Sequence, residues 1–154
     1  MTSIDKLIHQ VLQFCEHSAS EKRIKLEMNG EEILDAAVNP PLLEQALINL
    51  VENAIKYSDP KSLVTLGLEK QADKFIIGVK NQGFGIEAKH HERIFERFYR
   101  VDVARSRKLG GTGLGLSIVK HIIQAHQGTV SVTSTPGEGS TFLIQIPFIE
   151  MNPI

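Results

Sequence analysis

The chain has 154 residues, the length of one ordinary domain, and its 42% hydrophobic and 23% charged residues are typical of a globular protein. Its formal net charge of −1 gives no basis for bulk attraction to nucleic acid. No apolar run approaches the ~20 residues of a membrane span. The single cysteine, Cys15, excludes an internal disulfide and fits a reducing compartment.

The first third of the chain predicts a helix, two strands and a second helix. Apolar residues at helical spacing indicate a helix from 3 to about 19, with Ser3 as its cap. Alternation over 24–28 indicates a strand, and Asn29-Gly30 predicts a hairpin turn into a second strand over 33–38. Asn39-Pro40-Pro41 then begins a helix with an apolar face.

The rest of the chain predicts strand pairs separated by helices and loops, with Asp59-Pro60 ending the helix before them. The expected elements are strands over 63–68 and 75–79, a tight loop over 81–85, a short helix over 89–95, a mobile loop over 99–111, a helix behind 110–116, a strand from 129 and a last strand over 141–147. This order favours an α+β fold, a two-layer sandwich with helices on one face of a mixed sheet.

A glycine-rich stretch, Gly110-Gly111-Thr112-Gly113-Leu114-Gly115-Leu116, precedes an apolar helical pattern. Glycines let backbone approach a ligand closely, and a helix N-terminus offers free N–H donors to phosphate. A plain corner between a loop and a helix would need the same residues, so this stretch alone decides nothing.

The helix after Asn39 carries polar residues among its apolar ones. Asn49, Asn53 and Lys56 are spaced i, i+4 and i+7, hence on one face. An asparagine oxygen can bind Mg²⁺, which takes its other ligands from water and phosphate, and a lysine can pair with phosphate. A solvated polar face is the alternative for this helix taken alone.

Two further segments are candidates for a binding site. Gly83 and Gly85 flank Phe84 after a predicted strand, which allows a close turn against a flat ligand or a simple strand–helix turn. Farther on, Phe95 and Phe98 are spaced to anchor the base of a flexible segment, with Arg97 and Arg100 beside it. A small satellite core with solvated arginines would show the same pattern.

Together, in order, these motifs resemble the N, G1, F and G2 boxes of the ATP-binding catalytic domain of sensor histidine kinases. The matching runs are Asn49 to Tyr57, Gly83-Phe84-Gly85-Ile86, Phe95 to Arg100, and Gly111 to Leu116. The resemblance covers nearly the whole chain. It implies a Bergerat fold, with a mixed, mostly antiparallel sheet and a mobile lid over ATP from about Glu87 to Gly110.

The resemblance also implies the residues of a Mg²⁺–ATP site. Asn53 and Asn49 would bind the metal. The implied catalytic residues are Asn49, Glu52, Lys56 and Arg100. The implied nucleotide contacts are Asn53, Lys56, Tyr57, Asn81, Gly83, Gly85, Ile86, Tyr99, Arg100, Lys108, Gly110, Gly111, Thr112, Gly113, Leu114, Gly115, Leu116 and Thr141. The reaction would be phosphoryl transfer to a histidine, in which the protein mainly positions groups and neutralises charge.

Asn81 departs from the family pattern, which has an aspartate at this adenine-reading position. An amide keeps an acceptor oxygen but loses the charge and adds two donors. A charged hydrogen bond contributes about 1.5–3 kcal/mol against about 0.5–1.5 for a neutral one. We therefore expect roughly tenfold weaker ATP binding than with a carboxylate, and weaker rejection of guanine.

A phosphoacceptor histidine of the family type is also missing, because none of the six histidines has an acidic neighbour followed by proline. We expect His90 and His91 to be a solvated pair, and His121 and His126 to lie on the exposed side of their helix. The chain therefore reads as a monomeric catalytic fragment that binds ATP without phosphorylating itself. Its parent would be a dimer anchored in a bacterial membrane, with this domain in the cytoplasm, dimerisation helices as phosphoacceptor and a response regulator downstream.

Three alternatives come from related classes. ATP-hydrolysing members such as gyrase and Hsp90, and stand-alone anti-sigma serine kinases, usually place a glutamate four residues before the metal-binding asparagine. That position is Asn49 here, and an amide cannot act as a general base. A non-catalytic nucleotide-sensing module is the third alternative, and Asn81 favours it.

Overall fold

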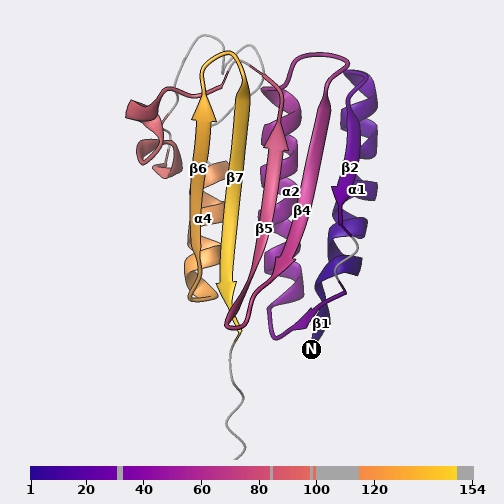
Figure 1. Cartoon of the computed structure of the whole chain (residues 1–154), viewed down its shortest axis with the longest axis vertical. Helices are drawn as coiled ribbons and strands as arrows, with labels where there is room; N and C mark the ends of the chain where they lie inside the picture. Colours follow the sequence, from indigo (N-terminus) through magenta and orange to yellow (C-terminus); the bar gives the residue numbers. More distant parts are fainter. Residues whose placement is uncertain (31–32, 84, 98, 100–114, 149–154) are drawn as a thin grey trace, which may run out of the picture.

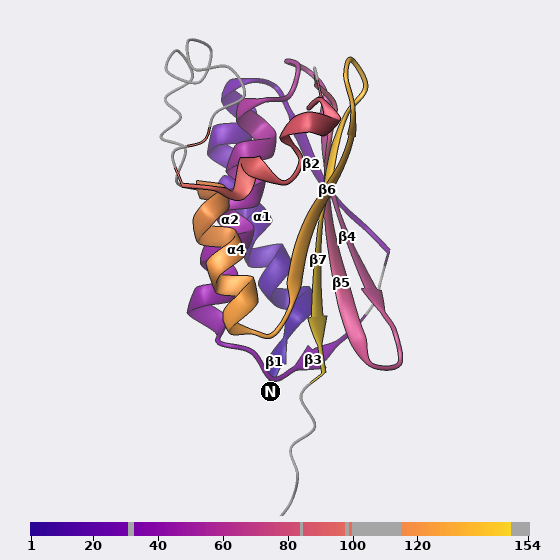
Figure 2. The same cartoon turned by 90° about the vertical axis from the view of Figure 1, so that its left-hand side faces the viewer.

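The computed structural model describes residues 1–30, 33–83, 85–97, 99 and 115–148. A five-stranded sheet forms one layer, and three described α-helices cover one of its faces (Figures 1 and 2). The helices are α1 (Ile4–Glu21), α2 (Pro40–Lys56) and α4 (Gly115–Ala125), with single 3-10 turns η1 (Ala88–His90) and η2 (Arg93–Phe95). The strands are β1 (Thr2–Ser3), β2 (Lys25–Asn29), β3 (Asp35–Ala36), β4 (Leu63–Lys70), β5 (Lys74–Asn81), β6 (Thr129–Thr135) and β7 (Gly139–Pro147).

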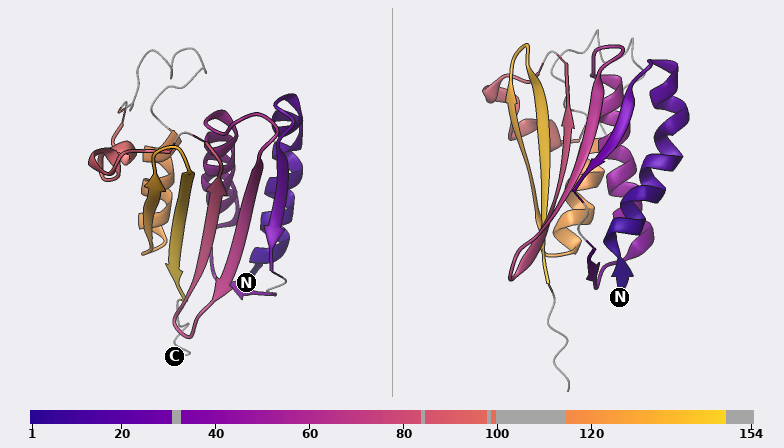
Figure 3. Two further views of the ribbon diagram at one scale, coloured as in Figure 1. Left: turned by 45° about the horizontal axis from the view of Figure 1, so that its top comes forward. Right: turned by 45° about the vertical axis from the view of Figure 1, so that its right-hand side comes forward.

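The sheet is mixed, as predicted, with strand order β2-β4-β5-β7-β6. Strand β2 runs parallel to β4, and every other neighbouring pair is antiparallel. The hairpins β4–β5 and β6–β7 are joined through the β5–β7 ladder at the centre. Views from two further directions show all three helices on the same side of the twisted sheet (Figure 3). The α+β sandwich predicted from the sequence is confirmed.

Alternating apolar residues explain which sheet face the helices cover. Phe75, Ile77 and Val79 of β5 are buried, as are Phe142, Ile144 and Ile146 of β7, while the residues between them are more exposed. Helix α2 lies across the centre of this face and contacts both α1 and α4. Its Leu43, Leu47 and Leu50 are fully buried. Burying each such side chain contributes about 1.5–3 kcal/mol.

The predicted hairpin through Asn29-Gly30 is wrong. Gly30 does turn the chain, with a φ of +83°. The following run, however, does not pair with β2. Instead, Leu34 donates its N–H to the Asp5 carboxylate (3.1 Å) and accepts from the Ile4 N–H (2.8 Å), and the two-residue β3 pairs with β1. The start of α1 therefore takes the hydrogen bonds that a hairpin would have used, and β4 pairs with β2.

The two long helices begin differently. At α2, the Asn39 side chain accepts from the Leu42 N–H (3.1 Å), which confirms the predicted cap. At α1, Ser3 occupies the cap position, but its hydroxyl donates to Asp5 and makes no capping bond. His126 was expected to be exposed; that is wrong, because its ring is buried and its Nε2 accepts from the Asn39 N–H (3.0 Å). That contact fixes the end of α4 to the start of α2.

The short helix expected over 89–95 is instead the pair of 3-10 turns η1 and η2. Phe95 is buried beneath them and meets the Phe142 ring edge-on, with ring centres 6.1 Å apart. This contact attaches the segment to the sheet, as expected for an anchor. The predicted mobile loop over 99–111 lies outside the described residues except for Tyr99. No helix in the described part of the chain is long and apolar enough to cross a membrane.

Candidate functional site

One face of α2 carries the polar stripe Asn49, Asn53 and Lys56, as the sequence predicts. All three side chains are half-buried. Within the described residues, no hydrogen bond involves the side-chain amide of Asn49 or of Asn53. Half-buried amides without protein partners are costly unless water or a ligand satisfies them. The stripe therefore has oxygen donors available for a cation or a polar ligand.

Glu52 lies on α2 between the two asparagines in sequence, but its charge acts toward α1. Burial, with a smaller contribution from Glu52, raises the pKa of the Cys15 thiol on α1 to about 12. Cys15 is therefore an inert core residue rather than a nucleophile. Glu52 is half-buried, and its charge acts on Cys15 of the neighbouring helix α1.

Asn81 is the last residue of β5 and is only 5% exposed. Its Oδ1 accepts from the Ser140 N–H (3.0 Å) and from the Ser140 hydroxyl (2.7 Å). Its Nδ2 donates to the Ala54 carbonyl of α2 at a longer 3.5 Å. Because the Ser140 N–H can only donate and the Ala54 carbonyl can only accept, the orientation of the amide is fixed at both ends. Asn81 thus joins the sheet to the helix that carries the stripe.

Ser140, which the sequence analysis did not name, bonds to Asn81, whereas Thr141, which it did name, lies on the other face of β7. Neighbouring residues of a strand point to opposite faces. Ser140 points toward the helices with Phe142 and Ile144, whereas Thr141 lies on the open face and lines a shallow hollow with Thr65 and Lys80. Thr141 therefore lies on the opposite face of the sheet from α2, and the structure does not bring it together with the other predicted site residues.

Gly83 and Gly85 are required by the protein's own backbone. A Cβ at Gly83 would lie 2.1 Å from the Tyr57 carbonyl oxygen, and one at Gly85 would lie 2.3 Å from that of Thr135. Gly85 also has a φ of +73°, which other residues rarely adopt. These two glycines let the loop after β5 pack against the end of α2 and the end of β6.

The segment after this loop is held by histidines. Ile86 donates its N–H to the Ser134 hydroxyl (2.7 Å), and His91 Nε2 bonds to the Ile86 carbonyl (2.9 Å). His90 Nδ1 bonds to the Tyr99 hydroxyl, and the Arg93 guanidinium lies 4.6 Å from the centre of the Tyr99 ring. The solvated pair predicted for His90 and His91 is therefore wrong, because both rings are half-buried and bonded.

The remaining predicted site residues divide into two groups. Gly115 begins α4, and Leu116 packs against the core from its first turn. Phe98 and the predicted ligands Arg100, Lys108, Gly110, Gly111, Thr112, Gly113 and Leu114 lie outside the described residues. The structure thus brings together the α2 stripe, Asn81, Gly83, Gly85 and Ile86 at one end of the sheet.

Comparison with known proteins assigns the family. Residues 38–150 match the family described as histidine kinase-, DNA gyrase B-, and HSP90-like ATPase. The chain belongs to this ATPase family. Within it, the relatives are sensor kinases: the chain is 40% identical over 144 residues to the sensor-like histidine kinase SenX3 of Mycobacterium tuberculosis. That match covers 94% of this chain and 35% of SenX3, so the chain spans about a third of such a relative.

Solved structures of histidine kinases share the fold of this ATPase domain. The mycobacterial sensor histidine kinase MprB superposes with a TM-score of 0.83 at 25% identity, covering 97% of each chain. Histidine kinase ThkA, solved in complex with the response regulator TrrA, superposes with a TM-score of 0.80 at 25% identity, covering 99% of this chain and 42% of ThkA. The chain is therefore an ATP-binding catalytic domain of the two-component sensor histidine kinase type.

Proposed function

We propose that this chain is a single catalytic domain that binds Mg²⁺–ATP and, within its parent protein, directs the γ-phosphoryl group to a histidine on the dimerisation helices. The observation that carries the proposal is the pair of half-buried amides, Asn49 and Asn53, one turn apart on α2 and unpartnered among the described residues. They lie on the helix to which Asn81 is bonded.

The residues present fit the metal that the family implies. Asn53 and Asn49 would hold Mg²⁺ through their side-chain oxygens, and neutral amide ligands leave the phosphates to supply the negative charge. When bound, the ion would neutralise charge on the phosphates. Lys56, one turn from Asn53, would add a cation for the same phosphates. Glu52 acts toward α1, so we assign its carboxylate no part in binding.

The base would lie against the buried pair Asn81 and Ser140. Both lone-pair directions of the Asn81 oxygen are already directed at Ser140 donors, and the amide nitrogen offers only N–H groups. The site therefore gives the adenine amino group a poorer acceptor than an aspartate would. This supports weak binding of ATP and incomplete rejection of guanine nucleotides.

Several relatives bear on the partners of the parent protein. The ThkA complex contains a response regulator, which supports a phosphorelay from the histidine to a regulator aspartate. The SenX3 and MprB names describe sensor kinases, which supports a parent anchored in a bacterial membrane with this domain on the cytoplasmic side. An amide at Asn49 gives no general base for serine, so a serine kinase is not proposed.

Calorimetric titration with a non-hydrolysable ATP analogue, with and without Mg²⁺, tests the binding site. We expect saturable binding that Mg²⁺ strengthens, and we expect Asn53→Ala to remove the strengthening by Mg²⁺ without changing the melting temperature. Gln71→Ala, in the exposed β4–β5 turn, is the matched control. Transfer of labelled phosphate to separately supplied dimerisation helices then tests the reaction. Binding without transfer would leave a nucleotide-sensing module, and no binding at millimolar nucleotide would overturn the proposal.

A further inference from the structure

Lys22, just beyond the end of α1, places its ammonium group at the end of α2. The Nζ atom lies 2.9 Å from the carbonyl oxygens of Ile55, Lys56 and Ser58. An ammonium has three N–H donors and no acceptor. All three donors of Lys22 are therefore used, on three carbonyls of one turn that lies more than thirty residues later in the chain.

Two of these carbonyls, those of Ile55 and Lys56, belong to the last turn of α2, and the third, that of Ser58, lies just beyond its end. The last four carbonyls of a helix lack intrahelical partners, and they form the negative end of its dipole. A half-buried cation at this point satisfies both needs. Burial lowers the pKa of Lys22, while the nearby Asp59 charge acts in the opposite direction. The ammonium is thus partly desolvated, which strengthens its bonds to the carbonyls.

The turn that Lys22 holds is also the turn that carries the proposed phosphate residues. Lys56 and Tyr57 follow Asn53 by three and four positions, and the Tyr57 N–H donates to the Asn53 carbonyl (3.2 Å). Beyond them, Ser58 forms a β-bridge with Gly83, and the Asp59 N–H donates to the Gln82 carbonyl (2.8 Å). One ammonium therefore holds the turn that follows the proposed metal-binding stripe and that bonds to the loop after β5.

We infer that Lys22 is a positioning residue for the nucleotide site, holding the last turn of α2 so that Asn53, Lys56 and Tyr57 face the phosphates in one fixed arrangement. This inference rests on the proposed function. Lys22 itself would not contact ATP. Its effect on affinity comes through the backbone of the turn, because a frayed turn would have to be ordered again when nucleotide binds.

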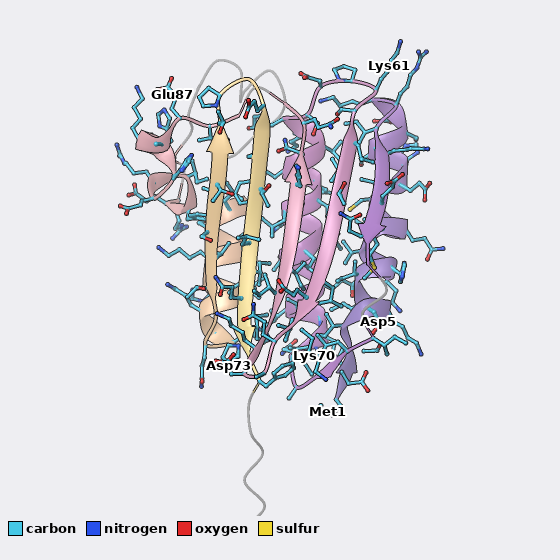
Figure 4. All side chains as sticks on the ribbon, viewed as in Figure 1. Met1, Asp5, Lys61, Lys70, Asp73 and Glu87 are labelled. Carbon is cyan, nitrogen blue, oxygen red and sulfur yellow. The ribbon has the colours of Figure 1, made fainter. Side chains whose placement is uncertain are left out.

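The test is ATP affinity in Lys22→Met, which removes the ammonium but keeps a long side chain. We expect the Kd for the ATP analogue to rise about tenfold, measured well below the melting temperature. Lys70→Met is the matched control, because Lys70 is exposed and lies at the opposite end of the sheet from Lys61 and Glu87 (Figure 4). It should leave the Kd unchanged.

A second control variant and a second measurement distinguish a positioning role of Lys22 from a general contribution to stability. Ile146→Val destabilises the core at the far end of the sheet, so equal loss of affinity there at matched stability would overturn the inference. Hydrogen exchange at the Tyr57 and Ser58 amides should accelerate in Lys22→Met relative to β5 amides, and Lys22→Arg should partly restore both protection and affinity. An unchanged Kd in Lys22→Met also overturns it. A wild-type chain that binds no ATP overturns the proposed function and this inference together.

Discussion

The two ends of the β5–β7 ladder are built from different chemistry. At one end, Phe75 pairs with Ile146. The Phe75 ring also packs against the Phe148 ring, and the two ring centres are 5.8 Å apart. At the other, Asn81 pairs with Ser140 and Gly83 contacts the end of α2. Apolar contacts are non-directional and tolerate small changes of shape, whereas each polar contact has one direction and leaves a buried unsatisfied group when lost. The ladder thus has apolar contacts that stabilise the fold at one end and the proposed base-binding pair at the other.

Gly83→Ala should break the polar end most severely. Its Cβ would lie 2.1 Å from the Tyr57 carbonyl, a backbone atom that cannot rotate away. We expect a loss of about 3 kcal/mol in the free energy of unfolding, with ATP binding lost in the folded fraction, since overpacking usually costs about 1–3 kcal/mol or more. Urea unfolding and calorimetry measure the two effects.

The matched control is Gly67→Ala on β4, where an added Cβ meets nothing within 4 Å. A glycine inside a strand costs about 0.5–1 kcal/mol relative to alanine, so this variant should be neutral or slightly more stable. Gly83→Ala with wild-type stability and affinity would show that the turn moves aside, and the polar end would then be less rigid than its contacts indicate.

Asn81→Asp should shift stability and affinity in opposite directions. The Ser140 donors would remain, but a carboxylate oxygen would replace the amide nitrogen that now faces the Ala54 carbonyl. We expect the nucleotide-free chain to lose about 1–3 kcal/mol, because a buried group loses its partner. The adenine amino group can then supply the missing donor, so ATP should bind about tenfold more tightly and the ratio of ATP to GTP affinity should rise.

Ser140→Ala is the companion change, since it removes one donor to Asn81 without adding charge. It should cost about 1 kcal/mol in stability, and because it frees one acceptor direction of the Asn81 oxygen, it should raise the ratio of ATP to GTP affinity, but less than Asn81→Asp does. Unfolding curves and competition titrations measure these quantities. If Asn81→Asp changed neither ATP affinity nor the nucleotide ratio, Asn81 would be a purely structural link between β5 and α2.

Ile146→Val should have the smallest effect, at the apolar end. Removing one buried methylene typically costs about 0.5–1.5 kcal/mol, and the remaining side chains can partly close the space. The ATP affinity of the folded chain should not change. A loss of affinity in this variant would mean that the two ends are coupled along the ladder, contrary to the separation described above.

Most of the fold followed from local patterns, and two of the errors share one cause. Alternation placed β4 and β5, and Asn39 with its two prolines placed the start of α2. The prediction of a hairpin after Gly30 is wrong because Leu34 bonds instead to Asp5, which is 29 residues away in the sequence. His126 was expected on the surface because nothing local shows that its ring accepts from Asn39, 87 residues earlier. Long-range hydrogen bonds of this kind have no signature in a short window of sequence.

The sequence placed Asn49, Asn53 and Lys56 on one face of α2, as the structure has them, but it did not predict that Ser140 is the partner of Asn81. The faces on which Ser140 and Thr141 lie could have been predicted, because Phe142, Ile144 and Ile146 already place the even-numbered residues of β7 toward the helices. No local pattern indicates the contacts of Lys22, because in the sequence it is one of several charged residues near the end of a helix. Its role depends on where two helix ends meet, which only the folded chain determines.

The order of the strands also bears on how the chain folds. The hairpins β4–β5 and β6–β7 are local and can form early, whereas the β5–β7 ladder joins residues such as Asn81 and Ser140 that are 59 positions apart. Closing so long a loop is slow and gains contacts only at the end. Because Asn81 and Ser140, the proposed base-binding pair, meet across that ladder, nucleotide affinity in refolding should recover with the slowest phase, later than the helical signal.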